Sequence, residues 1–285
     1  MAVSTFAKIT LKFSKLGTIV FSLFSLQGCA LQFLDWATPN TGYQVEKNIA
    51  YGTHNRQRID VYKPTTPSAQ NITILFFYGG SWEEGSKDKY RFVAQALAEK
   101  GHQVVVADYR VYPEVLFPGF MSDAAQALAW AADHLDQPIV LMGHSAGAHI
   151  AAMLALDSLY TSEFNVDAKR VIGLIGLSGP YDFLPLKRER LKTIFNAADD
   201  IQNTQPINFV TSSAPPALLV HGLADTAVLP FNTKNLAKKL SDNGVNVTMK
   251  LYPDKTHGVT VGALSVPFRK QLPILEDIQA FLATL

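Results

Sequence analysis

Short apolar runs of strand length alternate along the chain with longer segments in which apolar residues recur at helical spacing. The short runs are nearly continuous in Val, Ile, Leu and Phe, which is typical of parallel strands covered on both faces. They predict strands at Ile72–Tyr78, Gln103–Ala107, Pro138–Met142, Val171–Leu177, Pro216–His221 and Asn246–Tyr252. The longer segments predict helices at Lys87–Lys100, Met121–Leu135, Ala146–Leu159, Phe231–Asn243 and Pro273–Leu282.

The early stretch Tyr43–Lys63 has a different pattern, because apolar and polar residues alternate within residues 58–62. This alternation predicts two antiparallel strands. Together the patterns predict an α/β fold: a doubly wound, mainly parallel sheet with helices on both faces and N-terminal antiparallel strands. Ligands of such sheets bind at the carboxyl ends of the strands, so the candidate site is expected there.

The composition narrows the class of protein. Of the 285 residues, 48% are hydrophobic and 17% are charged, which excludes a disordered chain, a collagen-like fibre and a coiled coil. One cysteine excludes an internal disulfide framework and a cysteine-rich zinc module. The formal net charge of +1 gives no electrostatic reason to expect nucleic-acid binding.

The first 28 residues carry three lysines and no acid, and the apolar run Leu16–Leu26 follows the lysines. This run is shorter than the roughly 20 residues that a membrane-spanning helix needs. A basic start, a short apolar core and small residues after it are typical of an export signal. A membrane-anchoring or buried N-terminal helix is the alternative interpretation.

The clearest chemical motif is Gly143-His144-Ser145-Ala146-Gly147, which follows one predicted strand and opens a predicted helix. This is G-x-S-x-G in the strand–turn–helix context that a nucleophilic serine requires. The sharp turn exposes the serine hydroxyl above the sheet, and its strained backbone needs neighbours without bulky side chains. We therefore expect Ser145 to be a nucleophile.

A nucleophilic serine needs a histidine base, and the base needs an acid that orients it. His257 is the one histidine of seven that follows the last predicted strand. Asp225 follows the preceding strand, 80 residues after Ser145 and 32 before His257. Asp254 and Asp182 are alternatives for the acid.

Residues 78–82, Tyr-Gly-Gly-Ser-Trp, close the predicted strand Ile72–Tyr78. Paired glycines at such a place leave backbone N–H groups free to face a substrate. We expect Gly79, Gly80 and Ser81 to form an oxyanion hole together with the backbone N–H of Ala146.

One segment imitates a phosphate-binding loop without having its chemistry. Residues 80–87 read G-x-x-x-x-G-S-K, in which the last two residues stand in the wrong order. Glu83 and Glu84 would also repel phosphates, so a phosphate loop is rejected. No spacing of histidines and acids indicates a metal site.

The substrate pocket is less well defined by the sequence. Trp82, His144, Tyr181 and Phe183 follow strand ends and are candidates to line it. Residues 188–201 have no clear place in the alternation, and they form either a small cap over the pocket or a surface helix.

These motifs resemble the esterase/lipase branch of the α/β-hydrolase superfamily, which includes carboxylesterases, feruloyl-esterase-like enzymes and kynurenine formamidases. The resemblance covers about residues 45–283 and includes the chain order Ser145, Asp225, His257. It is carried by residues 59–64 (IDVYKP), 78–82 (YGGSW), 108–110 (DYR) and 143–147 (GHSAG). Two departures lie in the oxyanion segment: Tyr78 stands where this branch usually has His, and Ser81 where many members have Gly.

The resemblance implies a serine hydrolase that cleaves small to medium carboxylic esters through an acyl-enzyme, with no cofactor. A formamidase or another amidase would use the same three residues. A catalytically silent hydrolase fold used for binding is the alternative from a different class.

Residues 26–29, Leu-Gln-Gly-Cys, resemble the lipobox of bacterial lipoproteins, in which the cysteine is lipidated and becomes the first mature residue. The resemblance implies a lipoprotein-type signal peptide over residues 1–28 and a membrane anchor at Cys29. We then expect an N-terminal tether over residues 29–44, a catalytic domain over residues 45–285, and a place at the periplasmic face of a membrane. That membrane would be the outer one in a Gram-negative cell.

Overall fold

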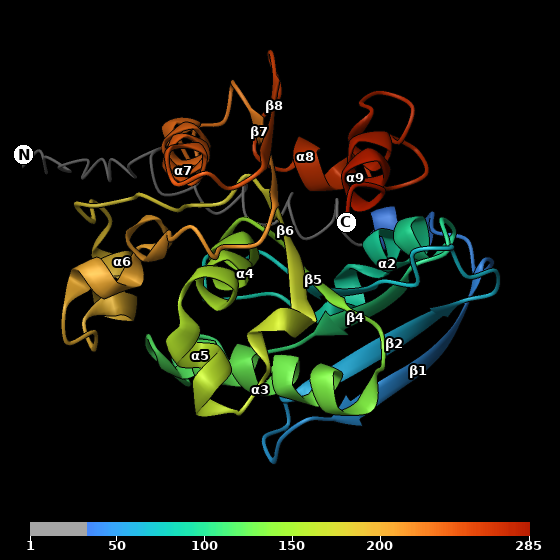
Figure 1. The fold of residues 1–285 in the computed structure, drawn as a ribbon, viewed down its shortest axis with the longest axis horizontal. Helices are drawn as coiled ribbons and strands as arrows, with labels where there is room; N and C mark the ends of the chain where they lie inside the picture. Colours follow the sequence, from blue (N-terminus) through green and yellow to red (C-terminus); the bar gives the residue numbers. More distant parts are fainter. Residues whose placement is uncertain (1–32) are drawn as a thin grey trace, which may run out of the picture.

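The computed structural model describes residues 33–285, so the predicted signal peptide and Cys29 lie outside the described residues. Eight strands form one sheet in the order β1-β2-β4-β3-β5-β6-β7-β8 (Figure 1). The pairs β1–β2 and β2–β4 are antiparallel, and every other pair is parallel. The strands are β1 Tyr43–Ala50, β2 Arg58–Pro64, β3 Thr73–Phe77, β4 Gln103–Ala107, β5 Ile139–His144, β6 Val171–Leu177, β7 Ala217–Gly222 and β8 Val247–Tyr252.

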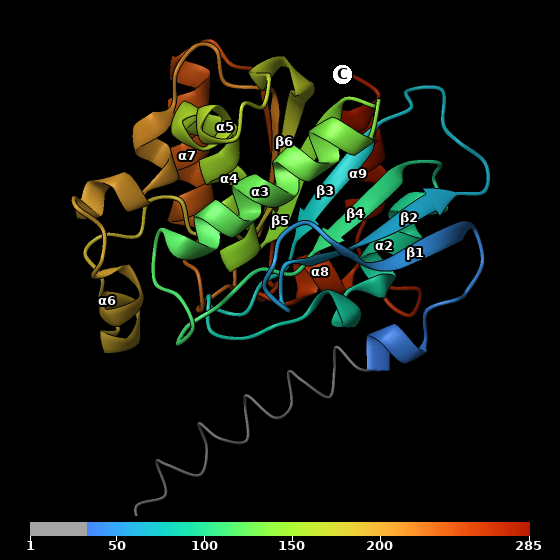
Figure 2. The ribbon, with the colours of Figure 1, turned by 90° about the horizontal axis from the view of Figure 1, so that it is seen from below.

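Helices cover both faces of this sheet, which confirms the predicted α/β-hydrolase fold. In Figure 2, α3 lies in front of the sheet, whereas α2, α8 and α9 lie behind it. The central strands β3 and β5 are fully buried, as their continuous apolar runs predict, and the edge strand β1 is mostly exposed. The alternating residues 58–62 lie in β2, but residues 59–62 are all buried, so this strand is not half-exposed as its alternation predicts. The helices are α2 Arg91–Ala98, α3 Gly119–His134, α4 Ala146–Leu156, α5 Ser158–Glu163, α6 Glu189–Phe195, α7 Phe231–Asp242, α8 Val259–Gly262 and α9 Ile274–Leu282.

Two predicted helices are interrupted, the second of them by a capping side chain. The helix expected from Lys87 to Lys100 begins as a 3-10 turn whose N-cap is Ser86, and α2 starts only at Arg91. The helix expected from Ala146 to Leu159 ends at Leu156, because the carboxylate of Asp157 caps the start of α5. Side chains that bond to nearby N–H groups compete with a continuous helix.

The described part of the predicted tether, residues 33–44, packs on the domain. Residues 33–36 form a helical turn in which Leu34 is buried, and Asp35 accepts a hydrogen bond from Arg91 Nε at 3.2 Å. An ion pair with Arg91 therefore holds this segment against α2, and the Leu34 side chain lies next to Gly262 of α8. Within residues 33–285, no helix combines the length and apolar character needed to cross a membrane.

Candidate active site

The turn between β5 and α4 carries Ser145 in a strained conformation, with φ 55° and ψ −124°. Glycines make the turn possible: a Cβ at Gly143 would clash with the backbone of Gly147, and a Cβ at Gly147 would clash with the carbonyl of Phe77. Gly79 packs so closely that an added Cβ would stand 2.9 Å from that of Ser145. The serine therefore lies between two glycine-dependent backbone segments.

Because the packing around Gly147 is so close, a single methyl group added there is expected to destabilise the folded protein strongly. We expect Gly147→Ala to lower the free energy of unfolding by about 3 kcal/mol or more, since overpacking against rigid backbone cannot be relieved by a rotamer change. Gly258→Ala is the matched control, because Gly258 has an ordinary helical φ and no atom within 4 Å of an added Cβ. Urea unfolding of both variants measures the difference, and an equal, small effect would contradict the packing argument.

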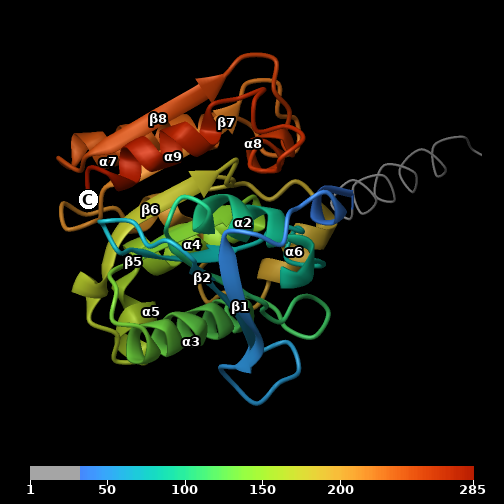
Figure 3. The same cartoon turned by 90° about the vertical axis from the view of Figure 1, so that its right-hand side faces the viewer.

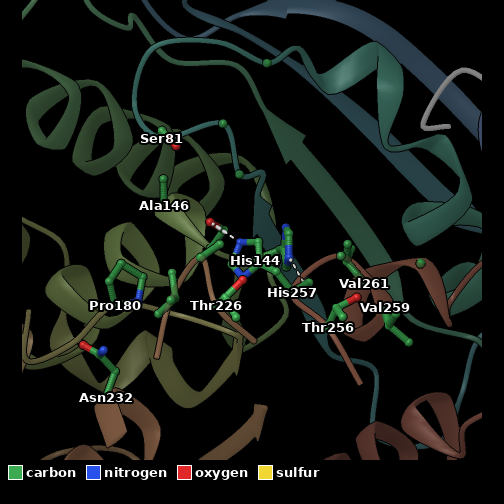
Figure 4. A pocket seen from close by; sticks show the side chains of 18 of the residues that line it. Ser81, His144, Ala146, Pro180, Thr226, Asn232, Thr256, His257, Val259 and Val261 are labelled. Atoms are coloured by element: carbon green, nitrogen blue, oxygen red, sulfur yellow. Dashed lines mark hydrogen bonds between the residues drawn. The ribbon is translucent and has the colours of Figure 1, made fainter. Parts of the chain in front are cut away.

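Three side chains from different strand ends meet above the sheet. The distance from His257 Nε2 to Ser145 Oγ is 2.8 Å, and that from His257 Nδ1 to Asp225 Oδ2 is 2.7 Å. A carboxylate only accepts, so Nδ1 of a neutral His257 carries the proton and Nε2 accepts from the serine hydroxyl. Figure 4 shows His257 beside His144 in the pocket that these residues line.

The carboxylate of Asp225 is buried, and both of its oxygens accept hydrogen bonds. Its Oδ1 accepts from the backbone N–H groups of Ala227 and Val228 at 2.9 and 3.0 Å, and its Oδ2 accepts from His257. Burial alone would raise the pKa of Asp225, but hydrogen bonds from His221, His257 and Val228 lower this pKa well below its usual range. A negative charge therefore stays beside His257.

His221 in β7 contacts the same carboxylate. Its Nε2 lies 3.1 Å from Asp225 Oδ2 and 3.0 Å from the carbonyl of Val228, and its Nδ1 lies 2.7 Å from Thr233 Oγ1. Both neighbours of Nε2 are acceptors, so this nitrogen carries a proton. The spacing of His221 four residues before Asp225 was the available sequence signal.

The alternative acids lie elsewhere. Asp182 accepts a hydrogen bond from Asn235 Nδ2 at 2.7 Å and is paired with α7. Asp254 is exposed in the turn after β8, at φ 55°. Neither carboxylate is among the hydrogen-bond partners of His257 in the described residues.

His144 stays neutral beside the serine. Burial, with a smaller contribution from His257, lowers the pKa of His144 to about 3. Its Nε2 lies 3.3 Å from the carbonyl of His257, to which a neutral ring donates. This hydrogen bond connects the turn that carries Ser145 with the loop that carries His257.

The segment after β3 presents backbone N–H groups to the pocket. Gly80, Ser81 and Trp82 all have positive φ, and among the described residues the N–H groups of Gly80, Ser81 and Ala146 take part in no hydrogen bond. The N–H of Gly79 likewise takes part in no hydrogen bond among residues 33–285, and Gly79 approaches Ser145 closely. Gly79, Gly80, Ser81 and Ala146 are therefore all placed as oxyanion candidates.

Tyr78, the last residue before the paired glycines, supports this segment through contacts of its side chain. Its ring stacks between those of Tyr90 and Tyr109, at centroid distances of 5.6 and 4.7 Å. Its hydroxyl accepts a hydrogen bond from Arg56 Nη2 at 2.9 Å. Aromatic stacking and a guanidinium contact thus support the glycine segment in this chain.

Ser145 and His257 open into a cavity of about 1110 Å³. Trp82, His144 and Phe183 line it, as expected from the sequence. The pocket assignment of Tyr181 is wrong: its side chain is fully buried and does not line the cavity. The backbone N–H groups of residues 181 and 182 donate to Asn232 Oδ1, and the Tyr181 ring turns under the end of β6, next to Gly176.

Other parts of the cavity wall come from residues that belong to none of the sequence motifs. Residues 184–191 contribute Leu184, Arg188 and Leu191, so the start of α6 borders the cavity. Residues 226–232, the segment 256–272 and the turn at Phe33 and Leu34 form further parts of the wall. Among residues 33–285, no group of three or more histidines, cysteines or acids is placed to hold a metal ion.

His149 on α4 packs into an aromatic cluster beside the cavity. Its ring meets Trp82 and Phe195 edge to face, and its Nε2 donates to the carbonyl of Thr204 at 2.9 Å. Burial lowers the pKa of His149 to about 4, although the bond to Thr204 favours the protonated form. The ring is therefore neutral at pH 7.

This buried ring predicts acid sensitivity. A histidine in the unfolded chain has a pKa near 6.5, so the unfolded chain binds a proton below about pH 6.5. In the folded protein, His149 binds this proton only below about pH 4. The contribution of His149 to the free energy of unfolding is complete above pH 6.5, and about 2 kcal/mol of it is lost at pH 5. We expect His149→Gln to lose less stability than the native chain between pH 7 and pH 5 in urea unfolding. The exposed His134→Gln is the control, and equal losses in all three proteins would contradict the prediction.

The fold and the arrangement of these side chains define an α/β-hydrolase of the esterase branch. The chain belongs to the BD-FAE family, whose model matches residues 59–240.

Named proteins of similar sequence support the assignment to the esterase branch. The chain is 29% identical over 242 residues to a probable isoprenylcysteine alpha-carbonyl methylesterase from Oryza sativa subsp. japonica, which covers 75% of this chain and 57% of the rice protein. It is 29% identical over 219 residues to a kynurenine formamidase from Salmo salar, covering 74% of both chains. The chain spans little more than half the length of the plant relatives that it matches.

A solved structure of esterase B from Lactobacillus rhamnosis has the same fold. It superposes with a TM-score of 0.74 and covers 94% of this chain and 95% of its own, at 19% sequence identity. At this level of identity, the likeness concerns the fold.

Proposed function

We propose that this protein is a carboxylic-ester hydrolase in which Ser145, His257 and Asp225 form a catalytic triad. The observation that carries the proposal is the unbroken hydrogen-bond chain from Asp225 through His257 to Ser145, which ends in an open cavity. The names of the plant and fish relatives, a methylesterase and a formamidase, agree with acyl transfer to water.

In the proposed reaction, the Ser145 oxygen attacks the ester carbonyl while His257 Nε2 takes the hydroxyl proton. The N–H groups of Gly80, Ser81 and Ala146 stabilise the negative oxygen of the tetrahedral intermediate. The carbon–oxygen bond to the alcohol then breaks, and His257 gives its proton to the leaving alkoxide. An acyl-enzyme remains on Ser145.

Water completes the cycle by the same steps in reverse order. His257 takes a proton from a water molecule, whose oxygen attacks the acyl carbonyl. Collapse of the second intermediate releases the carboxylic acid and returns the proton to Ser145. Asp225 remains ionised throughout and stabilises the imidazolium form of His257.

A fluorophosphonate probe followed by a substrate panel tests this function. We expect the probe to label Ser145, and the enzyme to hydrolyse p-nitrophenyl esters faster than an N-formyl arylamine. A preference for the formamide would assign the formamidase alternative, which the salmon relative suggests. Absence of both labelling and turnover would favour a silent fold that only binds.

We also propose that the exported protein is held at a membrane through lipidated Cys29, facing the periplasm. We expect Cys29→Ser to move the protein from the membrane fraction to the soluble fraction of cells. Mass spectrometry of the N-terminal peptide measures the acylation directly. An unchanged membrane fraction together with an unmodified native Cys29 would overturn this proposal.

A further inference from the structure

Large apolar side chains are exposed around the opening of the cavity. Phe33, Leu229, Phe231 and Phe268 line it, yet between 39% and 51% of each side chain remains exposed. They come from three separate segments of the chain, since Leu229 and Phe231 are neighbours. Single exposed apolar residues are ordinary, but a group around one opening indicates an interaction surface.

Trp36 extends this group beyond the cavity wall. Its side chain is 79% exposed, and its ring centroid lies 6.1 Å from that of Phe33. We call Phe33, Trp36, Leu229, Phe231 and Phe268 the apolar rim. Figure 3 shows the helical turn of residues 33–36 (blue) on the same side of the molecule as α6 and α8, with α5 on the opposite side.

The charges of the cavity wall are mainly positive. Lys89, Lys187 and Arg188 line the cavity, and Glu84 is the one acid among its described lining residues. Exposed aromatic residues beside basic residues are typical of a surface that lies on an anionic bilayer.

The position of the rim in the chain also indicates a bilayer. Phe33 follows Cys29 by four residues and follows the apolar run Leu16–Leu26 by seven. Four extended residues span at most about 14 Å. Attachment to a membrane through Cys29 would therefore keep the rim close to the lipid surface.

We propose that the apolar rim docks on the surface of an anionic phospholipid bilayer and that lipophilic esters enter the cavity from that bilayer. The docking rests on the rim and its charges, whereas the entry of esters rests on the proposed function. Docking removes the rim from water and places the opening of the cavity at the lipid surface.

Tryptophan reporters in the full chain test the contact. In a Trp36→Phe background, Leu229→Trp places a reporter on the rim, and Leu159→Trp places one on α5, where the native leucine is also exposed. Trp82 and Trp130 are common to both proteins. We expect vesicles of phosphatidylglycerol with brominated acyl chains to quench the reporter at position 229 and to spare the one at position 159.

Equal quenching at both positions, or none, would overturn the docking. Vesicles of phosphatidylcholine alone should quench less, and added salt should weaken quenching on the anionic vesicles. A concentration-dependent dimer without lipid quenching would assign the rim to a second copy of the chain and overturn the proposal.

Hydrolysis measurements separate docking from catalysis. Trp36 does not line the cavity among the described residues, so we expect Trp36→Ser to hydrolyse a short water-soluble ester at the native rate. Its hydrolysis of an ester dissolved in anionic vesicles should fall about tenfold, because an amphipathic surface loses its apolar contact. Leu159→Ser should retain both rates.

Failure of the proposed function and failure of the bilayer proposal would give different results. A native chain that hydrolyses neither ester contradicts the proposed function, whereas the reporters still decide docking. A Trp36→Ser variant that retains both rates contradicts entry of esters from the bilayer.

Discussion

Ser145→Ala is expected to lower kcat for ester hydrolysis by about 10⁶-fold, because triad members act as a unit once the nucleophile is lost. The hydroxyl at this position is the group that the hydrogen-bond chain from Asp225 and His257 reaches. Steady-state hydrolysis of p-nitrophenyl acetate and labelling with a fluorophosphonate probe measure the loss.

The control for this variant is Ser213→Ala, which changes an exposed serine whose hydroxyl contacts Thr211. That variant should keep native activity. Unfolding curves should show that Ser145→Ala remains folded, so that lost activity reports chemistry. Retained hydrolysis in the folded Ser145→Ala protein would reject the proposed nucleophile.

Asp225→Asn is expected to lower kcat by about 10⁴-fold. The amide has nearly the shape of the carboxylate but carries no charge, and it can donate to His257 Nδ1. His257 would then hold the wrong tautomer, with its Nε2 proton facing Ser145. KM should change far less than kcat, because the carboxylate is buried behind His257 and does not line the cavity among the described residues.

Asp182→Asn and Asp254→Asn provide matched controls, because both carboxylates lie away from His257. Each should retain native kcat for the same ester. A severe loss in either control, combined with an active Asp225→Asn protein, would move the orienting acid.

Patterns of a few residues were enough to predict most of the fold. The buried strand β3 follows from continuous hydrophobicity, and the antiparallel pair β1–β2 was predicted from the early stretch Tyr43–Lys63. The prediction was wrong where one side chain ended a helix, as Asp157 does after α4. Periodicity records which face is buried, but it does not record a cap that competes for the same N–H groups.

For the candidate site as well, some features could be predicted from the sequence and others could not. The glycines around Ser145 and the chain order of the three side chains were visible in the sequence, because turn chemistry and topology are local or ordered along the chain. Tyr181 was assigned to the pocket from its place after a strand, but its side chain is buried next to Gly176 of β6, and its backbone N–H donates to Asn232. The direction of a side chain after a strand depends on partners far along the chain.

The sequence by itself determined the order of strands and helices and the motif that strains the backbone at Ser145. Only the tertiary structure decided that His221 shares the carboxylate of Asp225, and that Phe33 reaches the cavity wall. Hydrophobic spacing and turn residues act within one or two elements, so they can be read along the chain. Convergence of side chains depends on how the elements pack, and residues 33, 145 and 257 meet at one cavity only after the sheet has brought its strand ends together.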